Sequence, residues 1–165
     1  MDEVSIIGID LAKRVFQVHG ASADGQVVFR KKLSRKMFLQ FITEHPACIV
    51  AMEVCATGHY WGREFSKMGH EVRLIPPQYV KPFVKRQKND ATDAEAIAEA
   101  ACRPTMRFVS IKSAEQQALG AVFRSRDLIV RQRTQCINAL RAHLAEFGIV
   151  STRGIGSIKS LIHEA

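Results

Sequence analysis

The sequence predicts an α/β domain with a mixed β-sheet and flanking helices, followed by one long amphipathic helix. Three strand-like segments occur within the first 31 residues, and helix-like and strand-like segments then alternate to about residue 111. From Ser113 to Phe147 there is no proline, and no glycine after Gly120, which predicts an uninterrupted helix. We therefore expect a domain over residues 1–111 and a long helix over residues 112–148.

The first three segments have the patterns of neighbouring strands. Val4–Asp10 is mostly apolar, as expected for a central strand that is covered on both faces. Arg14–His19 alternates between polar and apolar residues, and Gln26–Lys31 follows a turn at Ala23–Gly25. These three segments therefore predict three consecutive strands at the start of the domain.

The remaining elements of the domain alternate between helix and strand. Gly69 and the pair Pro76-Pro77 end two of them. The expected helices begin at Ser34, Thr57 and Asp90, and the expected strands cover Cys48–Met52, Glu71–Ile75 and Met106–Ile111. Three antiparallel strands followed by parallel ones, with helices covering the sheet, form a ribonuclease-H-like domain.

Length and composition narrow the class of protein. The 165 residues and the hydrophobic fraction of 47% fit a folded domain with a core. No apolar stretch approaches the ~20 residues that span a bilayer, and the first residues carry acids where a signal peptide carries bases. The four cysteines are scattered, which is typical of small apolar residues in a reducing compartment. We expect a cytoplasmic protein with no membrane partner.

The charge of the chain is unevenly distributed. The net charge is +8, and residues 1–102 hold 14 bases and 12 acids whereas residues 103–165 hold 10 bases and 4 acids. A basic chain favours polyanionic partners. The second part therefore supplies most of the positive field, and the acidic candidates lie in the first part.

Four carboxylates stand at strand ends and at a helix start. Asp10 ends the first apolar run, Glu53 closes the run Cys48–Glu53, and Asp90 and Asp93 lie three residues apart at the start of a helix. Asp90 and Asp93 also fit a capping pair, and Glu53 also fits the start of a loop. Together, however, four converging carboxylates are ligands for a hard divalent cation. The pattern predicts an enzyme of phosphodiester chemistry that uses Mg²⁺, with Mn²⁺ as a substitute.

Two regions are candidates for contacts with nucleic acid. The segment Gln78–Lys88 combines aromatic and basic residues and suits a phosphate backbone, although a solvated surface loop has the same composition. In the long helix two arginines occupy places in the apolar stripe. The candidate nucleic-acid-binding residues are Lys81, Lys85, Arg86, Lys88, Arg126 and Arg133. We expect the apolar stripe of the helix to be buried against another surface. We favour a second copy of the chain as that surface over the preceding domain.

Four ordered motifs resemble a known family along almost the whole chain. They are Gly8-Ile-Asp10-Leu-Ala-Lys13, Met52-Glu53-Val-Cys-Ala-Thr-Gly58, Lys88-Asn-Asp90-Ala-Thr-Asp93-Ala-Glu-Ala and Asn138-Ala-Leu-Arg141-Ala-His-Leu-Ala-Glu-Phe-Gly148. In this order they resemble the DEDD insertion-sequence transposases, which are related to the pilin-gene invertases and include bridge-RNA-guided recombinases.

The resemblance implies a fold, an activity and partners. It implies a ribonuclease-H-like domain of the Holliday-junction-resolvase (RuvC-like) type and a long helix used in dimerisation. It also implies DNA transposition and recombination with a structured guide RNA, and a DEDD set of Asp10, Glu53, Asp90 and Asp93 that is both catalytic and metal-binding. Family members carry a nucleophilic serine in a C-terminal transposase domain. We expect residues 149–165 to be a linker to that domain, which is absent from the sequence, so that this chain is not fully active alone.

Two other classes of function share some of these features. Actin-like sugar and acetate kinases also begin with a strand ending in Ile-Asp, but a glycine-rich hairpin follows that aspartate, whereas Leu11-Ala-Lys13-Arg14 follows here. A non-catalytic nucleic-acid-binding dimerisation module would use the same basic segments and keep the acids as structural residues.

Overall fold

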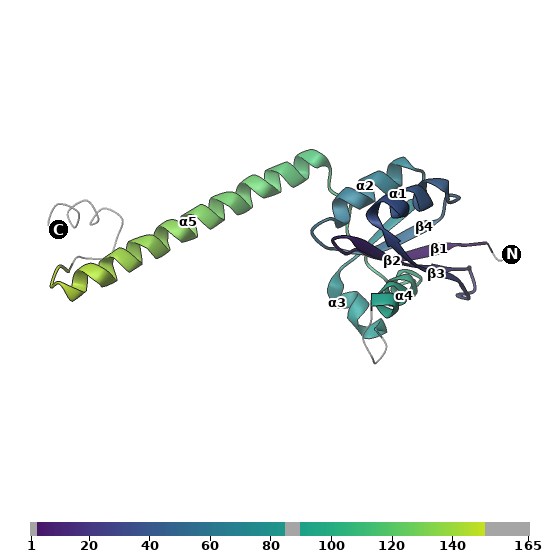
Figure 1. The fold of residues 1–165 in the computed structure, drawn as a ribbon, viewed down its shortest axis with the longest axis horizontal. Helices are drawn as coiled ribbons and strands as arrows, with labels where there is room; N and C mark the ends of the chain where they lie inside the picture. Colours follow the sequence, from purple (N-terminus) through teal and green to yellow (C-terminus); the bar gives the residue numbers. More distant parts are fainter. Residues whose placement is uncertain (1–2, 85–89, 151–165) are drawn as a thin grey trace. The chain divides into compact units, whose positions relative to one another are not determined.

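The computed structural model describes residues 3–84 and 90–150 of the chain. The chain divides into two compact units, Met1–Ala114 and Glu115–Ala165. The first unit contains the sheet, and the described part of the second consists mainly of the helix α5 (Ala114–Glu146), which is treated by itself below (Figure 1).

A five-stranded mixed sheet forms the centre of the first unit. Its strand order is β3-β2-β1-β4-β5, in which β1 pairs antiparallel with β2 and parallel with β4. The strands are β1 (Ile6–Asp10), β2 (Val15–Ala21), β3 (Val27–Ser34), β4 (Ile49–Glu53) and β5 (Glu71–Ile75). This topology confirms the predicted α/β, ribonuclease-H-like fold: the first three strands are antiparallel, and β4 and β5 are added in parallel.

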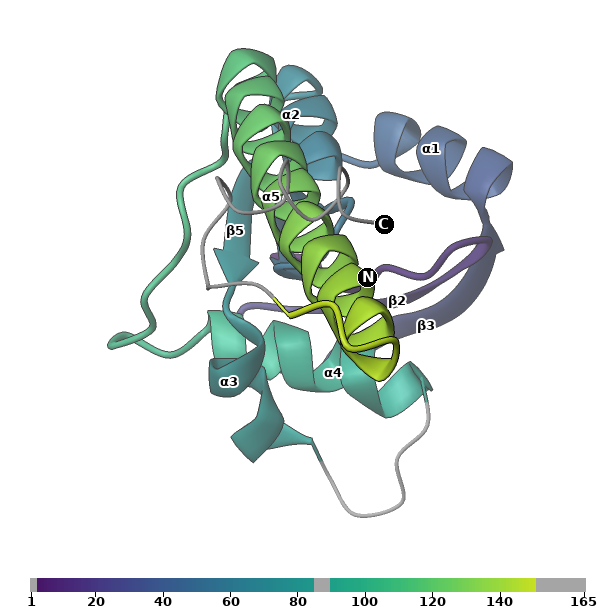
Figure 2. The same ribbon diagram turned by 90° about the vertical axis from the view of Figure 1, so that its left-hand side faces the viewer.

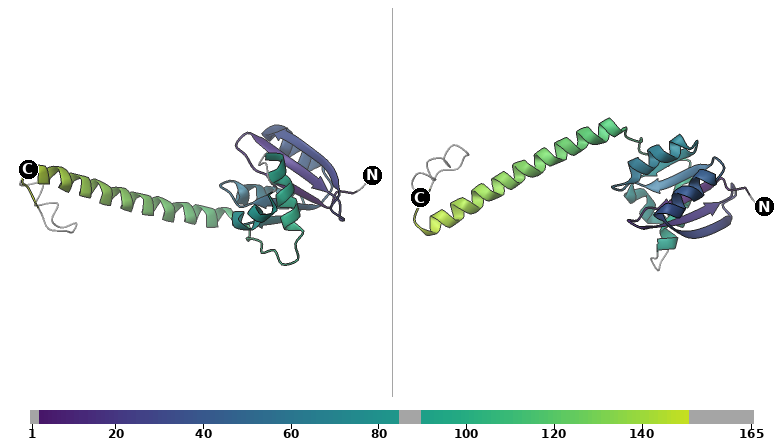
Figure 3. Two further views of the ribbon diagram at one scale, coloured as in Figure 1. Left: turned by 90° about the horizontal axis from the view of Figure 1, so that it is seen from below. Right: turned by 45° about the horizontal axis from the view of Figure 1, so that its top comes forward.

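Helices cover both faces of the sheet. Figures 1 and 2 show α1 and α2 together on one face and α3 and α4 on the other, and both views of Figure 3 agree with this layering. The helices of this unit are α1 (Arg35–Glu44), α2 (Gly58–Lys67), α3 (Pro77–Val80) and α4 (Asp90–Ala101), with a 3-10 turn η1 at Lys81–Phe83.

The face under α1 and α2 holds an aromatic core. Phe16 of β2 stacks on Phe38 of α1 with ring centroids 4.4 Å apart, and Trp61 and Phe65 of α2 meet Phe38 edge-on. Such pairs stabilise a core beyond the area that they bury. These rings fix α1 and α2 against β1, β2 and β4.

The face under α4 is packed with small residues, which lets the helix lie close to the strands. A Cβ atom on Gly8 of β1 would overlap the carbonyl oxygen of Ala94 and lie 2.7 Å from the amide nitrogen of Ala98. Glycine at position 8 is therefore required by this close approach. On the same face Ala51, Ala96 and Ile97 are buried.

The second unit contains α5 (Ala114–Glu146), a single helix of 33 residues, which confirms the long helix predicted for Ser113–Phe147. None of its residues is buried. Large apolar side chains on it are exposed, among them Val122 at 66% and Phe123 at 65%. No described helix is long and apolar enough to cross a membrane.

One expectation about the elements needs correction. The strand expected over Met106–Ile111 is wrong: Val109 forms only an isolated antiparallel bridge with Leu74 of β5. The segment crosses the edge of β5 at one point and does not run along it. In the segment from Gln78, α3 and η1 occupy residues 77–83, so that a short helix is followed directly by a 3-10 turn. Pro77 fits the first turn of α3, where its missing N–H has no acceptor to lose.

Candidate active site

Two of the predicted carboxylates end neighbouring parallel strands. Asp10 is the last residue of β1, and Glu53 is the last residue of β4. The two strands pair in register from Ile6 with Ile49 to Ile9 with Met52, so Asp10 and Glu53 follow directly after the last matched pair. The fold therefore brings together two acids that are 43 positions apart in the sequence.

Both carboxylates belong to the face of the sheet covered by α4. Successive side chains of a strand point to opposite faces. Ile7 and Ile9 lie in the core under α1 and α2, whereas Ile6 lies in the core under α4, and the same alternation places Val50 and Met52 opposite Ala51. Asp10 continues the series of Ile6 and Gly8, and Glu53 continues that of Ala51. Both are partly buried.

The start of α4 approaches this end of the sheet. Ile6 shares a cavity with Ala98 and Cys102, and Gly8 contacts Ala94 and Ala98. β1 and α4 therefore run in opposite directions here, so that the end of β1 at Asp10 lies toward the first turn of α4. That turn begins at Asp90 and contains Asp93, which is partly buried. The side chain of Asp90 lies outside the described residues.

The described side chains do not by themselves form a cluster that could hold a metal ion. Among them, no three histidine, cysteine, aspartate or glutamate residues form a group able to hold a metal ion. The chemistry of the side chains nevertheless fits Mg²⁺. Asp10, Glu53 and Asp93 come from three elements and offer hard carboxylate oxygens toward the same end of the sheet. The close approach at Gly8 holds those elements in place.

Polar and basic residues that the sequence analysis missed lie beside Asp10 on this face. Gln17 of β2 is directly opposite Asp10, and Lys32 of β3 is directly opposite Gln17. Arg30 is two residues before Lys32 and pairs with Glu95 of α4 at 2.8 Å. Strand alternation would have placed Arg30 and Lys32 on the side of Asp10, had the register of β2 and β3 been known.

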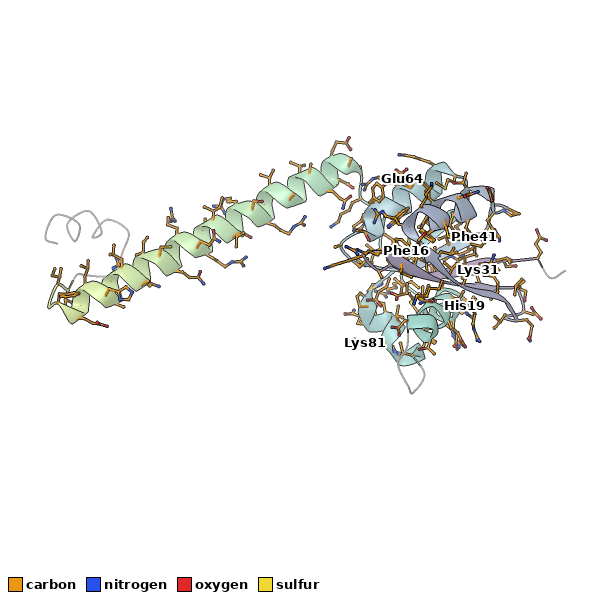
Figure 4. All side chains as sticks on the ribbon, viewed as in Figure 1. Phe16, His19, Lys31, Phe41, Glu64 and Lys81 are labelled. Carbon is orange, nitrogen blue, oxygen red and sulfur yellow. The ribbon has the colours of Figure 1, made fainter. Side chains whose placement is uncertain are left out.

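The predicted nucleic-acid contacts fall in different parts of the chain. Lys81 lies in η1 and is exposed, next to α3 (Figure 4). Arg126 and Arg133 are exposed on α5, and one Arg126 nitrogen lies 3.5 Å from Asp127. Lys85, Arg86 and Lys88 lie outside the described residues.

Figure 4 also shows how the two faces differ in chemistry. Phe16 points toward α1 and α2, while His19 of the same strand lies on the side of α4. Lys31 points to the aromatic side, with its Nζ atom 4.5 Å from the centroid of the Phe41 ring. The ionic groups next to Asp10 are thus separated from the aromatic core by the sheet.

Comparison with known proteins identifies the family. Residues 7–149 match the transposase family of the DEDD, IS110 type. The chain belongs to this DEDD transposase family. The match confirms the resemblance seen in the four motifs, and it spans β1 to α5.

Individual relatives support the same assignment. A probable family 20 transposase of Pseudomonas aeruginosa is 54% identical over 91% of this chain and 44% of its own length. The transposase for insertion sequence IS1328 of Yersinia enterocolitica is 49% identical over 98% of this chain and 48% of its own. The transposase for IS1111A of Coxiella burnetii is 42% identical over 93% of this chain and 42% of its own length. The chain thus spans less than half the length of these transposases.

One solved structure was also found to be similar. The structure of RuvC from Thermus thermophilus superposes with a TM-score of 0.45 at 15% sequence identity, covering 63% of this chain and 99% of that one. The topology of the sheet, described above, is what establishes the fold of this chain.

Proposed function

We propose that this chain forms the metal-binding catalytic part of a transposase that cuts and rejoins DNA. The observation that carries the proposal is the position of Asp10 and Glu53 at the ends of neighbouring parallel strands, on the face that α4 covers. Asp10 is the central ligand, Glu53 comes from the adjacent strand, and Asp90 and Asp93 come from the first turn of α4.

The groups near the ends of β1 and β4 have distinct proposed roles. Asp10, Glu53, Asp90 and Asp93 would hold Mg²⁺, which would supply charge stabilisation for an in-line displacement at phosphorus. Lys32 provides a positive charge near the carboxylates that attracts the phosphodiester, and Gln17 can donate a hydrogen bond to it. The ion pair of Arg30 with Glu95 ties β3 to α4 and keeps the helix start in position.

Calorimetric titration of Mg²⁺ and Mn²⁺ into the chain tests the metal site. We expect Asp10→Asn and Glu53→Gln each to abolish binding or weaken it at least tenfold, because each removes an anionic ligand. Glu44→Gln is the matched control, since Glu44 is an exposed acid of α1 on the other face. Unchanged affinity in Asp10→Asn, with the control behaving like the parent protein, would refute the assignment of Asp10.

DNA and a structured guide RNA are the proposed partners. The family assignment supports DNA, and the net charge of +8 suits a polyanion. Arg126 and Arg133 are exposed on α5 and are available to phosphates. Binding should weaken steeply with salt, because phosphate contacts release counterions. Salt-dependent binding without any effect of Mg²⁺ on binding or cleavage would instead favour the non-catalytic dimerisation module.

Self-association through α5 is the proposed assembly. Its exposed apolar side chains include Val122, Ile129 and Val130, which lie together on one side of the helix. Val130→Asp places a charge in this stripe and should shift sedimentation from dimer to monomer. Gln135→Asp, on the opposite side of α5, is the control. Identical sedimentation of Val130→Asp and the parent protein would exclude this stripe as the interface.

A further inference from the structure

A cavity separate from the carboxylates lies within the first unit, between the α3–η1 segment and the residues that follow α4. Its volume is about 580 Å³, within the range of about 300–1,000 Å³ that is typical of ligand pockets. Residues from α3, η1 and the segment after α4 line it. Those used below are Tyr79, Phe83, Arg103, Met106 and Arg107.

The walls of the cavity combine flat rings with arginine side chains. The Arg103 guanidinium lies over the Phe83 ring, 5.3 Å from its centroid, and one of its nitrogens is 2.7 Å from a carboxylate oxygen of Glu99. Phe83 and Arg103 therefore lie against each other in one wall of the cavity. Tyr79 is 39% exposed, so part of its side chain is open to a ligand.

The charge of the cavity favours an anionic ligand. Its described lining contains two arginines, Arg103 and Arg107, and no carboxylate. Glu99 pairs with Arg103, whereas Arg107 is exposed on a segment with no acid among its lining neighbours. Arginine is well suited to phosphate because its planar guanidinium donates paired hydrogen bonds.

Aromatic faces next to guanidinium groups are the chemistry that recognises unpaired nucleotides. Bases of a duplex are stacked on each other and cannot present a free face, whereas an unpaired base can stack on an aromatic side chain. A purely apolar ligand would leave the arginines without a role, and a free phosphate would not need the rings.

We propose that this cavity binds one unpaired nucleotide of a single-stranded nucleic acid, with the base against Tyr79 and a phosphate at Arg107. The site needs no metal ion and does not involve Asp10 or Glu53. It extends the proposed function by adding a nucleic-acid contact away from the carboxylates. The ligand is the strand itself, either DNA or RNA, and the ribose distinguishes the two.

Fluorescence of 2-aminopurine tests the stacking, because this base loses emission when it stacks on an aromatic ring. A deoxyuridine oligonucleotide and a uridine oligonucleotide, each with one central 2-aminopurine, are titrated with the full chain in EDTA. Working without metal separates the outcome from that of the Mg²⁺ titration. We expect quenching with at least one of the two strands, and a preference between them identifies the sugar.

The variants assign the effect to the cavity. Tyr79→Ala should remove the quenching and weaken binding about 5- to 100-fold, the range found for loss of a base–aromatic stack. Tyr79→Phe should retain the quenching because the ring remains. Tyr60→Ala is the matched control, since Tyr60 is the other tyrosine of the chain and is 44% exposed on α2.

The phosphate contact is tested in the same way. Arg107→Gln should weaken binding of the single strand and reduce its salt dependence, whereas Lys36→Gln, an exposed cation of α1, should change neither. Absence of quenching in the parent protein, equal quenching by Tyr79→Ala, or equal quenching when the probe base is paired in a duplex would each overturn the proposal.

Discussion

Gly8→Ala should separate α4 from the sheet and disturb the proposed metal site without changing any carboxylate. The added Cβ atom would overlap the carbonyl oxygen of Ala94 and come within 2.8 Å of the Ala98 Cβ atom. Two of the three atoms that it meets are backbone atoms, so no side-chain rotation can make room. The helix or the strand must move.

The size of the effect follows from these distances. Carbon atoms pack at about 3.5–4.0 Å, so α4 has to retreat by roughly 1 Å. Overpacking of this kind typically costs about 1–3 kcal/mol of stability. For a unit of about 100 residues, this lowers Tm by about 5–20 °C. Because the same displacement moves the first turn of α4, Mg²⁺ affinity should fall by about 10-fold or more.

Differential scanning calorimetry and Mg²⁺ titration measure the two effects. Gly120→Ala makes the same chemical change in α5 and is the control. Its added Cβ atom would lie 3.3 Å from the end of the Arg124 side chain, which can move away. Alanine is also favoured over glycine in a helix by about 0.5–1 kcal/mol. Gly120→Ala should therefore stabilise α5 slightly and leave Mg²⁺ binding unchanged.

A Gly8→Ala protein with the parent's Tm and Mg²⁺ affinity would exclude both the close packing of α4 on β1 and its link to the proposed metal site. A protein with a lower Tm but unchanged Mg²⁺ affinity at a temperature where it is folded would separate the two claims. It would support the close packing and exclude α4 as a source of metal ligands.

Three further predictions concern other parts of the first unit. Burial, together with the charges of Lys112 and Arg63, lowers the pKa of His59 from 6.5 in the folded protein. The unfolded chain therefore binds the proton more tightly, and the stability of the protein should decline as the pH falls below about 6.5. His59→Asn should reduce this dependence of Tm on pH between pH 8 and pH 5. Phe38→Leu should cost about 1–3 kcal/mol in urea unfolding, because Phe38 is fully buried and contacts three aromatic rings. Burial raises the pKa of Cys48 to about 11. Iodoacetamide at pH 8 should therefore label Cys48 more slowly than the three exposed cysteines. Mass spectrometry measures this difference in labelling rate, which unfolding in urea should abolish.

The elements with strong local patterns were predictable from the sequence. Glu71–Ile75 is a strand with the predicted bounds, because β-branched and apolar residues are followed by two prolines that cannot continue it. Gly69 ends the turn after α2 with φ of +91°, a conformation that glycine adopts readily. The long helix was equally clear, since nothing between Ala121 and Glu146 breaks it.

The partners of each element were harder to predict. The Met106–Ile111 segment has strand-like residues, yet only Val109 bridges to β5. Local propensity does not determine whether an edge pairs over its whole length. Likewise, Gly8 was part of a motif, but its need for a close helix contact depends on α4, which lies more than 80 positions away. Gln17, Lys32 and the cavity beside α3 and η1 depend on register and on the path after α4, which no local pattern contains.

Strand alternation links the predictable and unpredictable parts of the candidate site. The sequence identified Asp10 and Glu53 as strand-end acids but left open whether they share a face. The parallel register of β1 and β4 decides this: a shift by one residue would place one of the two on the aromatic side, under α1 and α2. There a charge would be surrounded by Phe16, Phe38 and Trp61, at a cost of several kcal/mol. The core that fixes the register therefore also fixes which of the strand-end acids share a face of the sheet.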